Sequence, residues 1–254
     1  NRGIKIFHME AGLRAWDRRM PEQRNRILID HMSNILLPYN SYHRENLIKE
    51  NIHPSKIFVT GNTTFEVMRH FLPKIDGSTI LKKLKLTSKN YILATAHRSE
   101  NVDNPHYLKI IMQSLGEISK KFNCEVIYPM HPRTQSKLDI SKSSKGVKII
   151  NPLGFYDFSK LLKESMCVIS DSGTAAEEGI FYGVPNVSLR MATERPETVE
   201  SGSTIITGMK PQNIVDSVVT ALELPWAVKY DFAEDHSPSS VVVNAIRSDI
   251  TNFF

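Results

Sequence analysis

The sequence predicts an α/β fold built on parallel sheets, and three observations support this prediction. The chain has 254 residues, 41% hydrophobic and 23% charged, which is typical of one large or two ordinary globular domains. Short aliphatic and β-branched runs alternate with amphipathic stretches, which is the pattern of βα units. Small and polar residues follow several of these runs, where the carboxyl ends of parallel strands place ligand-binding loops.

Nine short runs are predicted as strands because they are aliphatic or β-branched and end in turn residues. They are residues 4–7, 35–37, 57–60, 91–95, 125–128, 147–150, 167–170, 186–189 and 204–206. Seven stretches with apolar residues at three- and four-residue spacing are predicted as helices. They are residues 24–33, 41–50, 63–71, 105–122, 158–164, 175–182 and 211–222, and a last amphipathic stretch at 238–254 predicts a terminal helix.

The distribution of strands predicts two domains. Six predicted strands lie between residues 91 and 206, enough for a complete doubly wound domain, whereas residues 1–72 supply only three. Residues 73–78 have the Pro, Gly, Asp and Ser content of a linker. The predicted parts are the latter part of an N-terminal domain at 1–76, a complete doubly wound domain at 77–236, and a terminal helix at 237–254.

Composition and charge exclude several classes of function. The net charge is +5, but the 32 Lys and Arg residues are interleaved with 27 Asp and Glu and form no dense basic stripe, so we expect no nucleic acid. A modest positive field would equally suit a small anionic substrate, so charge alone does not decide the partner. The apolar runs fall far short of the ~20 residues that cross a bilayer, so we expect no membrane partner and a cytoplasmic location. Cys124 and Cys167 lie in predicted strands and are interpreted as core residues.

The sharpest local signal is a predicted strand that ends in Asp171-Ser172-Gly173-Thr174 and passes at once into a small-residue helix. Small side chains let backbone N–H groups approach an anion closely, and the helix dipole adds positive charge at that end. Phosphate suits such a turn, and Glu177 or Glu178 could accept hydrogen bonds from ribose hydroxyls. The alternative is an ordinary strand–helix turn capped by Ser172.

Two other predicted strands end in histidine and arginine. His97 and Arg98 follow residues 91–95, and His131 follows residues 125–128. Arg98 or His97 could meet a diphosphate, and His97 could assist proton transfer. The alternative is an accidental cluster in a polar loop, which the repetition after a second strand makes a poorer explanation.

Two glutamates near the start of the chain are candidate acid/base residues. Glu10 follows the first predicted strand, and Glu22 lies at the start of a predicted helix. A carboxylate that is close to another one, or partly desolvated, holds its proton more tightly and can donate near neutral pH. The alternative for Glu22 is a simple favourable interaction with the helix dipole.

A proline-containing loop after residues 186–189 carries Glu194, Arg195 and Glu197. Arg195 could neutralise a phosphate, or the two glutamates could pair with local lysines. The sequence lacks zinc-ligand spacing, a Gly-x-Ser-x-Gly elbow, and the Walker and Rossmann glycine fingerprints. Metal, serine-hydrolase and NAD chemistry are therefore disfavoured, and we expect no metal and no cofactor.

Seven short motifs occur in order along the chain. They are His8-Met9-Glu10-Ala11-Gly12-Leu13-Arg14, Pro21-Glu22-x-x-Asn25-Arg26, Thr60-Gly61-Asn62-Thr63, His97-Arg98-x-Glu100, Asp171-Ser172-Gly173, Glu177-Glu178 and Thr193-Glu194-Arg195-Pro196-Glu197. Together they resemble the non-hydrolysing UDP-N-acetylglucosamine 2-epimerases, with matching order and spacing from near residue 1 to about residue 210. The resemblance implies a two-domain glycosyltransferase-B-like fold, a UDP-sugar substrate bound in an interdomain cleft, and a homodimer.

The resemblance also implies a mechanism and residue roles. A base removes the C2 proton while UDP leaves C1, and UDP then re-adds to 2-acetamidoglucal as C2 is reprotonated from the other face. By motif, Glu10 and Glu22 are the acid/base carboxylates, and His97 is catalytic or contacts UDP. The other implied contacts are Arg98, Phe158 near the uracil, Ser172, Gly173 and Thr174 at the diphosphate, Glu178 at the ribose, Arg195 at phosphate or sugar oxygens, and His131 at a possible regulatory UDP-GlcNAc site.

Some positions depart from the family pattern. Thr174 stands where a second Gly is usual, and it adds a Cβ where the backbone should approach phosphate. Gln23 replaces a second Glu, and Ala96 stands where Gly is common. The family's first strands, with further nucleotide contacts and a catalytic Asp, should lie before Asn1. We therefore expect the 254-residue chain alone to be inactive.

The favoured function is that of an isomerase that converts UDP-GlcNAc to UDP-ManNAc for surface polysaccharide precursors. One alternative is an epimerase of another UDP-2-acetamido sugar, because no identified residue distinguishes the C4 or C6 substituents. A second is a glycosyltransferase-B-type transferase, which would use the same phosphate-binding turn but would not need the pair of Glu10 and Glu22. A third is a nucleotide-sugar-binding fragment without turnover.

Overall fold

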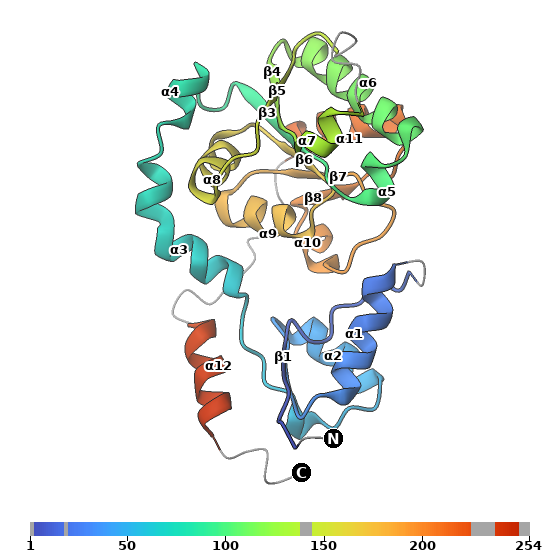
Figure 1. Cartoon of the computed structure of the whole chain (residues 1–254), viewed down its shortest axis with the longest axis vertical. Helices are drawn as coiled ribbons and strands as arrows, with labels where there is room; N and C mark the ends of the chain where they lie inside the picture. The colour runs from blue at the N-terminus through green and yellow to red at the C-terminus, as the bar shows by residue number, and fades with distance from the viewer. Residues whose placement is uncertain (1–2, 18–19, 138–143, 225–236, 249–254) are drawn as a thin grey trace. The chain divides into compact units, whose positions relative to one another are not determined.

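The computed structural model describes residues 3–17, 20–137, 144–224 and 237–248. Contacts within the chain divide it into two compact units (Figure 1). Unit 1 comprises Asn1–Arg69, Ala192–Glu197 and Asp231–Phe254, and unit 2 comprises His70–Met191 and Thr198–Tyr230. A short segment from the C-terminal half of the sequence therefore belongs to unit 1.

Unit 2 is built on a six-stranded sheet with strand order β5-β4-β3-β6-β7-β8, and all pairs are parallel. The chain enters at the central strand β3, winds outward to β5, returns to β6 beside β3, and winds outward again to β8. This is the doubly wound order, with its switch point between β3 and β6. The strands are β3 (Tyr91–Thr95), β4 (Glu125–Pro129), β5 (Val147–Ile150), β6 (Val168–Ser170), β7 (Asn186–Ser188) and β8 (Thr204–Ile206).

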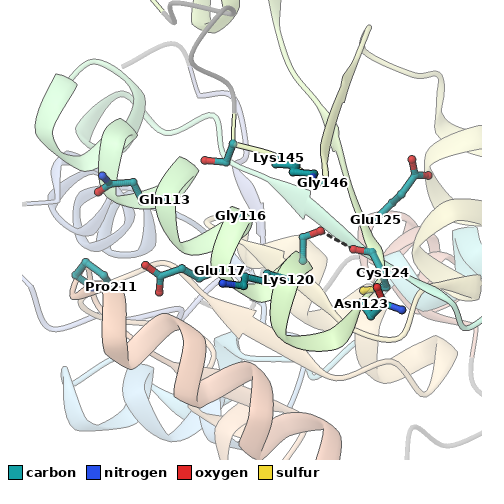
Figure 2. Close-up of a pocket in the computed structure, with 12 residues that line it drawn as sticks. Gln113, Gly116, Glu117, Lys120, Asn123, Cys124, Glu125, Lys145, Gly146 and Pro211 are labelled. Atoms are coloured by element: carbon teal, nitrogen blue, oxygen red, sulfur yellow. Dashed lines mark hydrogen bonds between the residues drawn. The ribbon is translucent and has the colours of Figure 1, made fainter.

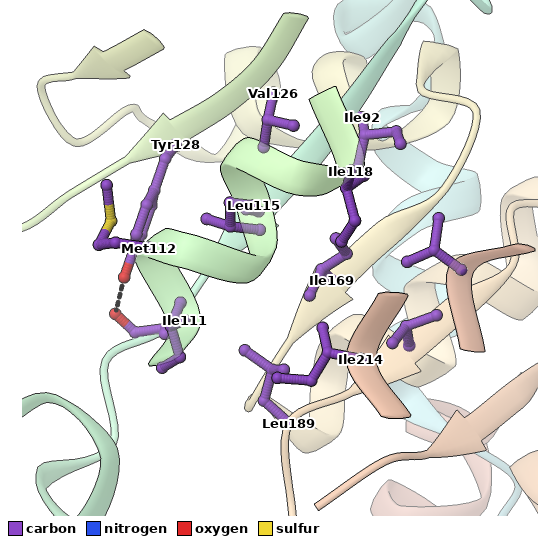
Figure 3. Close-up of a cluster of buried hydrophobic side chains, with 14 of the residues drawn as sticks. Ile92, Ile111, Met112, Leu115, Ile118, Val126, Tyr128, Ile169, Leu189 and Ile214 are labelled. Carbon is purple, nitrogen blue, oxygen red and sulfur yellow. Dashed lines mark hydrogen bonds between the residues drawn. The ribbon is translucent and has the colours of Figure 1, made fainter. Parts of the chain in front are cut away.

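Helices cover both faces of this sheet, because successive strand residues point to opposite sides. Ile92, Val126 and Ile169 join the core formed with helices α6 and α11 (Figure 3). Tyr91 and Leu93 join the opposite core, formed with α4 and α8. The helices of this unit are α4 (Ile80–Leu84), α5 (Ser99–Val102), α6 (Pro105–Phe122), α7 (Pro132–Gln135), α8 (Phe155–Glu164), α9 (Gly173–Tyr182) and α11 (Pro211–Glu223).

Unit 1 has a two-stranded parallel sheet in which Phe7 lies opposite Ile35 and Met9 opposite Leu37. Val242 and Ala245 pack against Ile35 and Leu37. The elements are β1 (Phe7–Met9), α1 (Pro21–Met32), β2 (Ile35–Leu37), α2 (Ser41–Lys49), the 3-10 helix η1 (Pro54–Lys56) and α12 (Pro238–Arg247). Helices α3 (Thr63–Asp76) and α10 (Pro196–Glu200) each contain a boundary between the units. No helix in the described residues is both long and apolar enough to span a membrane.

Two predicted strands in the N-terminal third are wrong. The first strand was expected at residues 4–7, but it is Phe7–Met9, and Ile4 is 71% exposed. Residues 57–60 form only an isolated bridge between Ile57 and Leu36 rather than a strand. An apolar run predicts burial, but only a neighbouring strand in register makes it part of a sheet.

The expected linker at residues 73–78 is also largely helical, because α3 continues to Asp76 with Pro73 inside it. Tertiary contacts hold this last turn. Asp76 accepts a hydrogen bond from Lys163 at 2.5 Å, and the ring of Phe71 packs edge-to-face on Tyr156 at 5.6 Å. At the other end of the chain, the predicted helix at 238–254 ends at Arg247, and residues 249–254 lie outside the described residues.

Candidate active site

The carboxyl ends of β3 and β6 lie next to each other at the switch point of the sheet of unit 2. Thr95 is paired with Ser170, so the loop that begins at His97 and the turn that begins at Asp171 leave the same edge. Asp171 connects them directly, because its buried carboxylate accepts hydrogen bonds from the backbone N–H groups of His97 at 3.1 Å and Arg98 at 3.0 Å. The sequence assigned no role to the side chain of Asp171.

The turn after β6 leaves the N-terminus of α9 without a side-chain cap. Ser172 occupies the N-cap position, but its hydroxyl makes no capping bond, and its own N–H donates to Ser170 Oγ at 2.9 Å. The cap predicted as the alternative is therefore not formed. The first-turn N–H groups at Gly173 and Thr174 have no partner within the helix, which is the arrangement that favours an anion. Thr174 is exposed, so the fold accommodates its extra Cβ.

Glu178 lies further along α9 and is 9% exposed. Burial, together with the charge of neighbouring Glu177, raises the pKa of Glu178 to about 7. Burial and then Glu178 raise the pKa of Tyr182 to about 12. Phe158, on α8, is partly buried against the core that contains Leu161. Glu178 is therefore a carboxyl group that can change protonation state near neutral pH.

The three remaining predicted residues of unit 2 differ in exposure. The side chain of His97 is 58% exposed, and its Nδ1 lies 3.3 Å from Asp171 Oδ1. Arg98 Nη1 donates to Glu100 Oε1 at 3.3 Å. His131 is exposed at the carboxyl end of β4. Of these residues, His97 is the one that combines exposure with a buried carboxylate beside its ring.

In unit 1, Glu10 directly follows β1 and has a left-handed backbone, with a φ of 64°. Arg195 Nη2 donates to Glu10 Oε1 at 3.0 Å, and Arg195 Nη1 donates to Glu194 Oε1 at 2.7 Å. Arg195 and Glu194 are 5% and 2% exposed. A non-glycine residue in this backbone region is strained, and such strain gathers at functional sites. The carboxylate of Glu10 is thus oriented by a buried guanidinium.

Arg195 lies in a different unit from the other proposed UDP contacts. By resemblance, Arg195 was grouped with the UDP contacts of the second domain, whereas the structure assigns Ala192–Glu197 to unit 1. Its guanidinium forms ion pairs with two carboxylates, those of Glu10 and Glu194. The phosphate contact of Arg195 stays a prediction. Glu22 lies in the first turn of α1, as expected, and is exposed.

Buried polar contacts hold the loop that carries Glu10. Arg14 is 1% exposed and bonds Glu50 at 2.7 and 2.5 Å and Asp30 at 2.7 Å. Burial alone would lower the pKa of Arg14, but its bonds to Glu50 and Asp30 raise it. The Gly12 N–H donates to the same Asp30 at 3.2 Å. Asp30 and Glu50 could not be identified from sequence, because they lie 16 and 36 residues from Arg14 and leave no short-range signal.

A surface pocket of about 1020 Å³ lies elsewhere in unit 2 (Figure 2). Its lining includes Glu125 at the start of β4 and Gly146 just before β5, so it lies at the amino ends of these strands. None of the predicted site residues lines it. In the described part of the chain, no group of three or more His, Cys, Asp or Glu residues is arranged to hold a metal ion.

The sheet of unit 2 is a doubly wound α/β sheet with an uncapped helix N-terminus at its switch point, which is where open α/β sheets bind their ligands. The sequence model of the UDP-N-acetylglucosamine 2-epimerase family matches residues 1–239. The UDP-N-acetylglucosamine 2-epimerase of Methanococcus maripaludis is 38% identical over 253 residues, which cover 96% of this chain and 69% of that protein. The chain belongs to this family, an isomerase family.

Other relatives agree with this assignment. The crystal structure of Methanocaldococcus jannaschii UDP-GlcNAc 2-epimerase, in complex with UDP-GlcNAc and UDP, has a TM-score of 0.88 at 36% identity and covers 96% of this chain and 70% of that one. The UDP-2,3-diacetamido-2,3-dideoxy-D-glucuronate 2-epimerase of Pseudomonas aeruginosa is 34% identical over 86% of this chain and 61% of that protein. The fold class and the family expected from the sequence are confirmed.

Proposed function

We propose that this protein converts UDP-GlcNAc to UDP-ManNAc by inverting C2. The observation that supports this most is membership of the UDP-N-acetylglucosamine 2-epimerase family, in a chain that retains both Glu10 and Glu22. The M. maripaludis relative is named for this activity, and the M. jannaschii structure holds UDP-GlcNAc and UDP.

The proposed reaction begins when a carboxylate removes the C2 proton. The C–H electron pair forms the C1–C2 double bond while the C1–O bond breaks and its electrons leave on UDP, which gives 2-acetamidoglucal. UDP oxygen then adds back to C1, and the second carboxylic acid delivers a proton to the opposite face of C2. Inversion requires one acid/base group on each face of the ring, and Glu10 and Glu22 are the proposed pair.

Unit 2 supplies the proposed UDP contacts. The N–H groups at the start of α9, with Ser172, Gly173 and Thr174, bind the diphosphate that accumulates charge as UDP leaves. Glu178 accepts hydrogen bonds from the ribose, and Phe158 packs near the uracil. His97 contributes to catalysis at the diphosphate or the leaving oxygen, and Arg98 contacts the substrate.

Arg195 has a proposed role in unit 1 that follows from its contacts. Arg195 donates hydrogen bonds to both Glu10 and the buried Glu194. The bond to Glu194 holds the guanidinium in place, and the guanidinium in turn fixes the orientation of the Glu10 carboxylate. A charged donor of this kind restricts the rotamers of its acceptor and favours a single geometry for proton transfer. The contact with phosphate or sugar oxygens, implied by the family, remains a further proposed role.

A second substrate class is favoured by one observation. The P. aeruginosa relative, 34% identical, is named for another UDP-2-acetamido sugar. An epimerase of such a sugar would use the same C2 chemistry, because the acetamido group and UDP leaving group are shared. A transferase of similar fold is the less favoured candidate, because it does not need two acid/base carboxylates.

The test is to incubate the full-length protein with UDP-GlcNAc alone and separate the nucleotide sugars chromatographically. We expect UDP-ManNAc to appear, and UDP-glucose to remain unchanged because it lacks the 2-acetamido group. Conversion of a diacetamido UDP-sugar in preference to UDP-GlcNAc would support the second substrate class. Turnover that requires a sugar acceptor would contradict epimerisation and support a transferase.

We also propose, from the family resemblance, a cytoplasmic homodimer that supplies precursors for surface polysaccharide. The proposed domain division remains 1–76, 77–236 and 237–254, and His131 is proposed to contact a regulatory UDP-GlcNAc molecule. Sedimentation equilibrium tests the dimer. A His131→Ala variant tests the regulatory site, because it should change the dependence of rate on UDP-GlcNAc concentration and leave UDP binding unchanged.

A further inference from the structure

Asp171 is a fully buried carboxylate surrounded by N–H donors. Its Oδ1 and Oδ2 each accept the backbone N–H of His97 at 3.1 Å, and Oδ2 also accepts from the Arg98 N–H and from Asn101 Nδ2, both at 3.0 Å. Its own N–H donates to the Thr95 carbonyl at 3.3 Å. A buried carboxylate with this many charge-assisted bonds holds the groups around it in one geometry.

Two functional segments meet at this side chain. Asp171 directly precedes Ser172, where α9 begins, and it anchors the loop that carries His97. Asn101, which is 4% exposed, extends the same contact to the Leu189 carbonyl at the end of β7. The carboxylate therefore fixes the loop after β3 relative to the phosphate-binding turn after β6.

The ring of His97 also faces this carboxylate. Its Nδ1 lies 3.3 Å from Asp171 Oδ1, while the side chain is 58% exposed. A carboxylate whose neighbours are all donors acts as an acceptor, so the ring nitrogen beside it is the one that carries a proton. Nε2 of the neutral ring is then the lone-pair nitrogen and is available to a substrate proton.

We propose that Asp171 is a positioning residue that selects the tautomer and orientation of His97, with the proton on Nδ1 and Nε2 presented to the substrate. This inference rests on the proposed catalytic role of His97. Asp171 touches neither substrate nor reacting atoms in this account and acts through the His97 ring. It joins the acid/base group and the diphosphate site at one buried anchor.

The direct test is the tautomer of His97 in the full-length protein. Long-range ¹H–¹⁵N NMR spectra show which ring nitrogen carries the proton, and a His97→Gln variant assigns the signal among the nine histidines. We expect a proton on Nδ1 in the wild type and a shift of the proton towards Nε2 in Asp171→Asn. A proton on Nε2 in the wild type would overturn the proposal, even if the variant did not fold.

Kinetics provide the second readout. Asp171→Asn should slow epimerisation by about 100-fold or more, because a comparable carboxylate-to-amide change leaves a neighbouring histidine in the wrong tautomer. Its dissociation constant for UDP should change little. Asp103→Asn, the same substitution at the exposed end of α5, should turn over normally. Normal turnover of Asp171→Asn, or a loss confined to UDP affinity, would contradict the proposal.

The two readouts separate this proposal from the proposed function. If the protein does not epimerise UDP-GlcNAc, the proposed function fails, while the tautomer of His97 still decides the pairing with Asp171. If it epimerises but the wild-type tautomer is the opposite one, only the role of Asp171 fails.

Discussion

At the scale of single residues, the proposed chemistry depends on a few carboxylates with different surroundings. Glu10 is held by a buried arginine in a strained turn, Glu22 is exposed at a helix start, and Glu178 is buried beside a second glutamate. Similar groups in different surroundings have different proton affinities and can take different roles. Each role can be tested by an isosteric change to an amide.

Glu10→Gln and Glu22→Gln should each reduce the epimerisation rate by about 100-fold or more, because each removes one proton-transfer group. The dissociation constant for UDP should stay close to that of the wild type, because neither glutamate is a proposed UDP contact. Steady-state kinetics and calorimetry measure both quantities. Glu45→Gln, at an exposed position of α2, is the matched control. Either variant turning over at the control rate would remove that residue from the mechanism.

Arg195→Lys should separate an orienting role from phosphate binding. A single ammonium group cannot reproduce the bonds of the guanidinium to both Glu10 and Glu194. We expect kcat to fall by roughly 10-fold or more, because the substitution removes one hydrogen bond between charged groups. The dissociation constant for UDP should change less. An equal loss in both would instead support the phosphate contact.

Glu178→Gln should change how stability depends on pH. Because the pKa of Glu178 is raised to about 7 in the folded protein, its contribution to stability is present below its ordinary pKa of 4.5 and is lost as pH rises through 7. Relative to the wild type, the variant should therefore gain stability between pH 5 and pH 8, by at most roughly 3 kcal/mol. Urea unfolding at the two pH values measures this gain. If the free energies of unfolding of variant and wild type differed by the same amount at both pH values, a buried, titrating Glu178 would be contradicted.

At the scale of elements, Gly12 lets the segment between β1 and α1 pack closely against α2. Gly12 has a φ of 80°, and a Cβ there would lie 2.2 Å from the His43 carbonyl oxygen of α2. Only glycine allows both this backbone and this close approach. The approach also brings Asn46 Nδ2 to 3.0 Å from the Gly12 carbonyl, which ties the loop after Glu10 to α2.

Gly12→Ala should destabilise the protein by about 2–4 kcal/mol, through left-handed strain and overpacking. Gly3→Ala is the matched control, because Gly3 also has a positive φ, of 67°, but no atom lies within 4 Å of its added Cβ. The control should cost about 1–2 kcal/mol, the strain alone. Urea unfolding compares the two, and equal losses would show that the contact with α2 does not matter.

The sequence predicted the elements of unit 2 well because the strands are buried on both faces and appear as continuous apolar runs. That the segments carrying His97 and Ser172 leave the same edge of the sheet could also be anticipated, since adjacent parallel strands end at one edge. The hydrogen bonds of Asp171 could not be anticipated, because they join residues 70 and 74 positions apart. Nor could the helical continuation through Pro73, which depends on contacts with Tyr156 and Lys163.

At the scale of the whole molecule, the chain distributes its proposed functions over two compact units. Unit 1 contains Glu10, Glu22 and Arg195, and unit 2 contains the turn at Ser172 with Glu178 and His97. The segment Ala192–Glu197 gives unit 1 its arginine from a distant part of the sequence. The two proposed C2 carboxylates thus lie in unit 1, whereas the proposed diphosphate and ribose contacts at Ser172 and Glu178 lie in unit 2.

The most direct test of this account is exchange of the C2 hydrogen. The full-length protein is incubated with UDP-GlcNAc in deuterated water, and proton NMR follows the C2 signal of the sugar. We predict loss of that signal as deuterium enters, together with the appearance of UDP-ManNAc labelled at C2. An unchanged C2 proton while the protein binds UDP would contradict the proposed epimerisation.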